Sequence, residues 1–188
     1  VTCYRNSVTV VAVFVSCNND AGSSDTTTAP NADTTPPVID PNTPVDIDLV
    51  SYNIIYPASW DETAIANIKP LTSAIEKATG GFANATTDKL ADGVTADQVS
   101  SEKEILIGNT NRPESAKALE GASTNSYVIA VVGNKLVINA NILDFTFDAI
   151  SYFATNYVGA SAGGVLALTA GHKYTSDPAG EIKLVDNS

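Results

Sequence analysis

The sequence predicts an α+β domain, a two-layer mixed β-sheet with two main helices, preceded by a signal segment and a disordered tether. Three observations predict this fold. Short runs rich in β-branched and aromatic residues recur along the chain and are typical of strands. Two stretches, residues 64–78 and 143–158, place apolar residues at helical spacing. A Gly133-Asn134 pair joins two apolar runs, which is a strong hairpin signal.

The strand signals are short and well separated. The clearest is EILIG at 104–108, which is apolar on both faces and should therefore lie in the middle of the sheet. Two further strands flank the Gly133-Asn134 pair. The predicted strands, in chain order, are 47–56, 82–88, 104–108, 126–132, 135–139, 165–168 and 181–185.

The first main helix has a start signal and a stop signal. Ser59 forms a capping-box pattern with Glu62, three residues later. Gly80-Gly81 should end the helix. Pro70 lies inside it and should kink it or divide it into two parts.

A short helix is expected after the strand at 104–108, and a long one near the C-terminal end. Asn111 can cap the short helix, and Pro113 suits its first position, so it should run to about residue 120. The long helix covers 143–158, and Gly159 should cap its end.

The charge of the chain excludes one class of partner. The formal net charge is −11, and residues 47–188 hold 16 acids against nine bases. An acidic surface repels phosphate backbones, so we expect no nucleic acid as a partner.

Cysteine and histidine are almost absent from the domain. The two cysteines are Cys3 and Cys17, and His172 is the only histidine. The domain therefore has no disulfide, no thiolate nucleophile and no zinc site built from His and Cys. We expect no metal and no cofactor.

Residues 1–17 have the pattern of a secretory signal peptide. Arg5 precedes a short apolar run, which is well short of the ~20 residues that span a bilayer. The run ends in FVSC, which resembles the bacterial lipobox, and that resemblance implies lipidation of Cys17. Leu is usual where Phe14 stands. The alternative is a buried N-terminal strand with an incidental cysteine.

Residues 18–46 predict a disordered linker. Thr, Pro, Asp, Asn and Ser dominate this stretch, which cannot bury enough apolar surface to offset the entropy of ordering it. A lipidated cysteine, a tether and then a domain at 47–188 is the layout of a surface lipoprotein. We therefore expect an extracellular protein, held to the bacterial membrane by its lipid anchor only.

The loop GNTNR, Gly108 to Arg112, is the best candidate binding site. Its backbone amides and the helix start could hold an anion or a sugar hydroxyl, with Asn109, Thr110 and Asn111 beside Arg112 as a fork of donors. Trp60, near the first helix start, could stack on a sugar ring. The alternative is structural: Gly108 permits a tight turn, Asn111 caps the helix, Arg112 pairs with an acid elsewhere, and Trp60 packs in the core.

Two catalytic patterns are present, and both have simpler explanations. GASAG at 159–163 matches the nucleophile elbow around Ser161, but here a helix leads in and a strand leads out, the reverse of the order that this chemistry needs. His172 is the only candidate base. The acid pairs that could serve a glycosidase look like helix-start or surface charges. These pairs are Asp61/Glu62, Glu102/Glu104 and Asp144/Asp148.

Residues 48–158 resemble a domain of surface lipoproteins from clostridia-like bacteria. The resemblance rests on YNIIYP, a helix ending in ATG, EILIGNTNRPES, SYVIAVVGNKLVINA and a helix with SYFATNYV. This order is similar to the small α+β domain that precedes the catalytic barrel in family-20 hexosaminidases and α-glucuronidases. In those enzymes the catalytic residues lie in the barrel, so the resemblance carries over no catalytic role.

The sequence thus favours a non-catalytic accessory module of a surface lipoprotein in a carbohydrate-binding or carbohydrate-processing context. Its expected partner is a glycan or a carbohydrate-active protein module. Two alternatives remain: a small glycoside-processing enzyme that uses a carboxylate pair, and a purely structural spacer.

Overall fold

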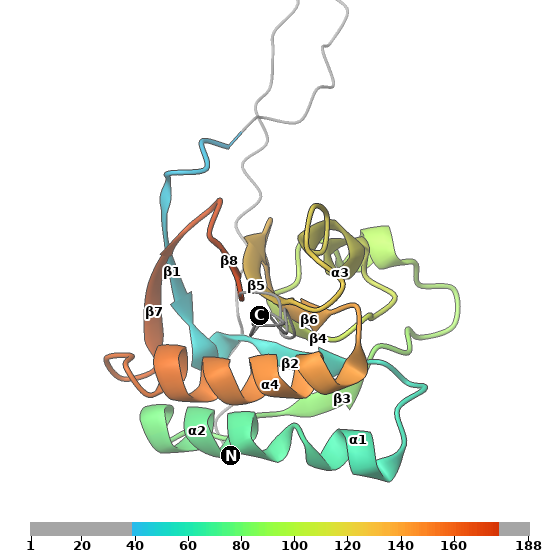
Figure 1. The fold of residues 1–188 in the computed structure, drawn as a ribbon, viewed down its shortest axis with the longest axis horizontal. Coiled ribbons are helices and arrows are strands. Elements are labelled where there is room, and N and C mark those ends of the chain that lie inside the picture. The colour runs from blue at the N-terminus through green and yellow to red at the C-terminus, as the bar shows by residue number, and fades with distance from the viewer. Residues whose placement is uncertain (1–38, 177–188) are drawn as a thin grey trace, which may run out of the picture. The chain divides into compact units, whose positions relative to one another are not determined.

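The computed structural model describes residues 39–176 (Figure 1). The predicted signal peptide, Cys17, most of the predicted linker and the strand predicted at 181–185 lie outside these residues. Within the described part of the chain, no helix is long and apolar enough to cross a membrane.

A six-stranded mixed sheet forms the centre of the domain, with strand order β3-β2-β4-β6-β5-β8. The neighbours among β3, β2, β4 and β6 are parallel, and β5 runs antiparallel to both β6 and β8. All four residues of β4 are buried, so its predicted central position is confirmed. The strands are β2 (Asn53–Tyr56), β3 (Ala85–Thr87), β4 (Glu104–Ile107), β5 (Tyr127–Val132), β6 (Lys135–Ala140) and β8 (Lys173–Thr175).

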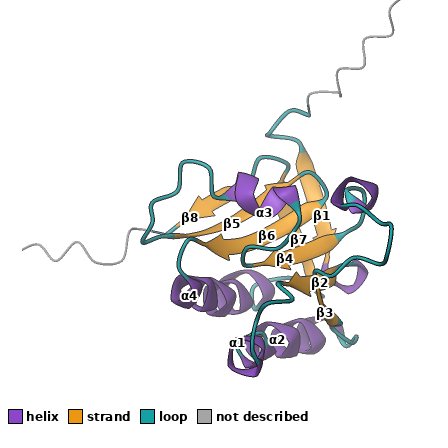
Figure 2. Ribbon diagram, turned by 90° about the vertical axis from the view of Figure 1, so that its right-hand side faces the viewer, coloured by secondary structure: helices purple, strands orange, loops and turns teal. Residues whose placement is uncertain are grey.

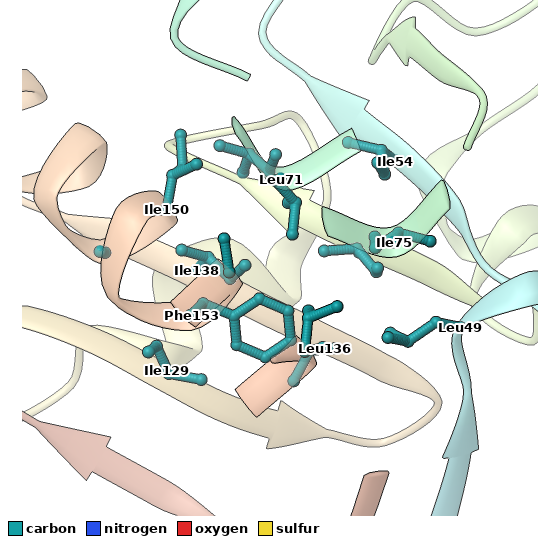
Figure 3. Close-up of a cluster of buried hydrophobic side chains, with 14 of the residues drawn as sticks. Leu49, Ile54, Leu71, Ile75, Ile129, Leu136, Ile138, Ile150 and Phe153 are labelled. Carbon is teal, nitrogen blue, oxygen red and sulfur yellow. The ribbon is translucent and has the colours of Figure 1, made fainter. Parts of the chain in front are cut away.

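Helices cover the two faces of this sheet unequally. Figure 2 shows α1 (Glu62–Ala66), α2 (Lys69–Thr79) and α4 (Leu143–Phe153) on one face and α3 (Pro113–Ala118) on the other. The larger core lies under α2 and α4, where Leu71, Ile75, Ile150 and Phe153 pack on apolar residues of the sheet (Figure 3). A smaller core lies under α3 and includes Leu106, Val128 and Val137. The predicted α+β fold with two main helices is confirmed.

The predicted strand at 47–56 is divided, which corrects the sequence prediction. β1 (Pro44–Asp48) pairs antiparallel with β7 (Val165–Thr169) in a separate two-stranded sheet. A single 3-10 turn at Leu49–Ser51 then leads into β2. The Asp48 side chain caps this turn by accepting a hydrogen bond from the Val50 N–H at 3.2 Å. Because β1 begins at Pro44, the last residues of the predicted linker belong to the domain.

The first helix is divided as Pro70 predicted, but a different residue caps it. α1 and α2 are separate helices, and Pro70 lies in the first turn of α2. The N-cap of α1 is Asp61, whose side chain accepts a hydrogen bond from the Ala64 N–H at 2.8 Å. Ser59 therefore does not form the predicted capping box.

The later elements follow the predictions in part. Asn111 does not cap α3; Arg112 holds the N-cap position without a side-chain cap, although Pro113 does begin the helix. The helix predicted over 143–158 is confirmed as α4 and a π-helical turn at Ala154–Val158, and Gly159 is its C-cap as predicted, in a right-handed conformation. The strand β8 was not predicted. The hairpin of β5 and β6 is confirmed.

Candidate functional site

The carboxyl ends of β2, β4 and β6 meet at one edge of the sheet, where the chain changes direction. After β2 the chain passes through α1 and α2 on one face and returns in β3, on one side of β2. After β4 it passes through α3 on the other face and returns on the opposite side, in β5 and β6. Two connections that diverge in this way leave a crevice at the carboxyl ends of the strands, where α/β proteins commonly bind ligands.

A pocket of about 300 Å³ lies in this crevice. Its walls come from the loops after β2, β4 and β6 and from the first turn of α4. Of the residues predicted as a site, the pocket contains Trp60 and Asn109, and it leaves out Thr110, Asn111 and Arg112. The lining residues are Pro57, Ser59, Trp60, Gly108, Asn109, Ala140, Asn141, Leu143 and Thr146.

Trp60 forms a wall of the pocket and also packs in the core. Its ring stacks on Tyr56, with centroids 6.2 Å apart, and meets the edge of Phe147 at 5.7 Å. The backbone of Gly108 lies directly against it, since a Cβ built there would be 2.8 Å from Trp60 Cζ2. The ring is therefore fixed, and only part of it faces the pocket.

Arg112 does not offer a fork of donors to a ligand, which corrects the prediction. Its side chain is 5% exposed and forms two bonds with Glu104, Nε to Oε2 at 3.1 Å and Nη2 to Oε1 at 2.9 Å. Nη1 donates to the Asp88 carbonyl at 3.2 Å. The fully buried Lys135 also donates to Glu104 Oε2, at 2.7 Å. Arg112 thus holds α3 to the sheet through a buried, charge-assisted network.

Thr110 and Asn111 are also used within the fold. The Thr110 hydroxyl is buried and lies 2.7 Å from the Ser115 hydroxyl. Asn111 donates from its backbone N–H to Asp88 Oδ2 at 2.8 Å and from Nδ2 to the Asp88 carbonyl at 2.7 Å. Most of the GNTNR loop is therefore structural, and only Asn109 of its polar side chains borders the pocket.

Asp88, just after β3, is a residue that the sequence analysis missed. It is 8% exposed, and its two carboxylate oxygens accept from different loops: Oδ1 from the Ala58 N–H at 2.9 Å and Oδ2 from the Asn111 N–H. Asp88 therefore ties the loop after β2 to the loop after β4, and these two loops carry Trp60 and Asn109. No local pattern marks it, because its partners lie 30 and 23 residues away.

We expect Asp88→Asn to loosen both loops. The change replaces one carboxylate oxygen with an NH₂ group, which then faces the backbone N–H of Ala58 or Asn111. Both groups are hydrogen-bond donors, so one charge-assisted hydrogen bond is lost. The expected loss of unfolding free energy is about 1–2 kcal/mol. Hydrogen exchange should show faster exchange of the Ala58 or Asn111 amide, with the amides of β6 unchanged. Equal exchange at both loop amides in variant and parent would contradict this role.

The chemistry of the pocket is that of uncharged hydrogen-bonding groups. Asn109 and Asn141 follow the neighbouring strands β4 and β6, and each carries a donor and an acceptor, although Asn141 Nδ2 also donates to the Ser123 carbonyl at 3.4 Å. Ser59 adds a hydroxyl from the loop after β2. The remaining lining is largely apolar. Asn141 was not predicted; its signal is an amide directly after a strand, which becomes informative only once β4 and β6 are known to be neighbours.

Three residues of the two catalytic patterns, Ser161, Glu104 and Asp61, have structural partners instead, and the other acids of the pairs are exposed. GASAG follows α4 and precedes β7, and the Ser161 hydroxyl donates to the Val158 carbonyl at 2.7 Å. Glu104 is neutralised by Arg112 and Lys135, and Asp61 caps α1. Within residues 39–176, no three of His, Cys, Asp and Glu lie together as metal ligands.

A second polar cluster lies away from the pocket, where His172 meets a group of tyrosines. The Tyr157 hydroxyl lies 3.0 Å from His172 Nε2, and the rings of Tyr152 and Tyr174 stack with centroids 4.9 Å apart. Burial lowers the pKa of His172 below 6.5. Burial, with a smaller effect from Tyr152, raises the pKa of Tyr157 to about 12.

These two pKa shifts predict opposite changes of stability with pH. The unfolded chain protonates His172 near pH 6.5 and the folded protein only below it, so the free energy of unfolding should fall as the pH drops through 6.5. The stability that Tyr157 contributes is present below pH 10 and is lost as the pH rises toward about 12. The melting temperature, measured as a function of pH, should fall below pH 6.5 and again above pH 10.

Two variants test the assignment of these changes. His172→Gln should reduce the change of melting temperature between pH 7 and 5. Tyr157→Phe should reduce the change of melting temperature above pH 10. An unchanged pH dependence in either variant would show that other groups cause it.

No protein-family model matches the chain, and none of the curated proteins is similar to it.

Proposed function

We propose that this protein is a non-catalytic accessory module of a surface lipoprotein and binds glycan in the pocket at the carboxyl ends of β2, β4 and β6. The observation that carries the proposal is the convergence of Asn109, Asn141 and Ser59 on one pocket beside the ring of Trp60. Amide and hydroxyl groups bind sugar hydroxyls, and an aromatic wall suits the apolar face of a sugar ring.

The size and place of the pocket support the same proposal. About 300 Å³ is at the lower end of small-molecule sites and suits one or two sugar units of a chain. The site lies at the switch point of the sheet, and Asp88 and the Arg112–Glu104 network hold its loops. The extracellular, lipid-anchored setting is part of the proposal and rests on residues 1–46 alone.

The test is affinity electrophoresis of the protein in gels that contain soluble cellulose, xylan, mannan or starch polymers. We expect Asn109→Ala and Asn141→Ala each to weaken retardation, with a Kd about 2- to 10-fold higher for each lost hydrogen bond. Asn84→Ala is the matched control, because Asn84 is also an exposed amide and does not line the pocket.

The alternatives correspond to other outcomes of this experiment. Release of reducing sugar, measured in parallel, would show a glycoside-processing enzyme and contradict the non-catalytic part of the proposal. Neither retardation nor release would favour the structural spacer. Retardation that both pocket variants leave unchanged would place the glycan site elsewhere.

A further inference from the structure

The charged residues that directly adjoin the pocket's lining residues in the chain are acids. No charged side chain lines the pocket itself. These acids are Asp61, directly after Trp60, and Asp144, directly after Leu143; Glu62 follows Asp61. All three acids are exposed. A ligand in the pocket would therefore meet amides and hydroxyls, and an acid follows the lining residue in the chain at two of its walls.

Two bases of the elements around this site are already paired, and Lys89, two residues after β3, is exposed. Arg112 is the nearest base in sequence to the loop after β4, and its charge is buried against Glu104. Lys135 begins β6, at the other end of that strand from Asn141, and is fully buried against the same carboxylate. A carboxylate on a sugar would thus find no cation in the pocket to replace its lost hydration.

The start of α4 favours an anion, and Asp144 opposes it. Leu143 and Thr146 bring the first turn of this 11-residue helix to the pocket, and the N-cap residue Ile142 makes no side-chain cap. Its free N–H groups and helix dipole give this end a partial positive charge. Asp144 is the acid in that first turn, so it neutralises the end of the helix that borders the ligand.

We propose that the pocket selects uncharged saccharides over uronic or otherwise anionic ones, and that Asp144 is the specificity-determining residue. This inference rests on the proposed glycan-binding function. Asp61 caps α1, because its side chain accepts a hydrogen bond from the Ala64 N–H. Its negative charge is therefore fixed in the loop after β2, next to Trp60 in the chain. Asp144 differs because its removal would also expose the positive end of α4.

The test compares two derivatives of the neutral polymer that retards the protein. Its hydroxyethyl form carries uncharged substituents, and its carboxymethyl form carries substituents of similar size with a charge. We expect the parent protein to bind the carboxymethyl form more weakly at low salt. Asp144→Asn should narrow the ratio of the two Kd values by about 3- to 5-fold and leave binding of the hydroxyethyl form unchanged.

Asp148→Asn is the matched control. It removes the same charge from the same helix one turn later, where neither Asp148 nor its neighbours in the chain line the pocket. It should leave the ratio unchanged. A ratio that Asp144→Asn does not alter, that both variants alter equally, or that favours the carboxymethyl form in the parent would overturn the inference while glycan binding stands. Absence of binding to every polymer would remove the proposed function and this inference with it.

Discussion

Replacing Glu104 with glutamine is expected to lower the free energy of unfolding by about 3–5 kcal/mol. Glu104 begins the central strand β4, and its carboxylate is the only acid side chain that pairs with Arg112 and Lys135 among the described residues. Glutamine keeps the shape but removes the charge, so two buried cations lose their counter-ion. Urea denaturation of parent and variant measures the difference.

Glu102→Gln is the control for this result. Glu102 lies two residues earlier, is exposed and makes no ion pair among the described residues, so the change should stay within about 0.5 kcal/mol. A loss below about 1 kcal/mol for Glu104→Gln would mean that water reaches the network and that the ion pairs do not hold α3 on the sheet.

The second large effect is expected at Gly108, which leads from β4 to the candidate pocket. Its φ of +71° is a left-handed conformation that costs other residues about 1–2 kcal/mol. A Cβ there would also lie 2.8 Å from Trp60 Cζ2. Because Trp60 is held between Tyr56 and Phe147, the clash should add about 1–3 kcal/mol. Gly108→Ala should therefore lower the free energy of unfolding by about 2–5 kcal/mol and, under the proposed function, weaken glycan binding.

Two comparisons separate the conformational part from the clash. Gly121 has a φ of +74° and no atom within 4 Å of an added Cβ, so Gly121→Ala should show the conformational cost alone. In the background Trp60→Ala, the change Gly108→Ala should cost about as little as Gly121→Ala. If the cost at Gly108 is the same with and without the ring, the ring does not pack against Gly108 in solution.

The parts of the fold that local rules determine were predictable from the sequence. The Gly133-Asn134 hairpin, the division of the first helix at Pro70 and the central position of 104–107 depend on residues close in the chain. The prediction of one continuous strand at 47–56 was wrong because residues 47–48 belong to β1, which pairs with β7, about 120 residues later. No local pattern in β1 shows that its partner belongs to a second sheet.

The candidate site also combines residues that local patterns identify with residues that only the strand order brings together. The sequence identified the loop after β4 and left open whether Arg112 binds a ligand or an acid; the structure shows the acid, Glu104. Which acid it is depends on the side of the sheet on which α3 lies. Asp88 and Asn141 reach the site from β3 and β6, so their contribution depends on the strand order.

The central claim is that the pocket at the carboxyl ends of β2, β4 and β6 holds a glycan. Its most direct test is an NMR titration of the ¹⁵N-labelled protein with an oligosaccharide of the polymer that retards it. The proposal predicts chemical-shift changes for the side-chain amides of Asn109 and Asn141 and for the Trp60 indole N–H. The backbone amide resonances of β8 should not change. Shifts centred on the Tyr152 and Tyr174 rings, or no shift at saturating oligosaccharide, would contradict it.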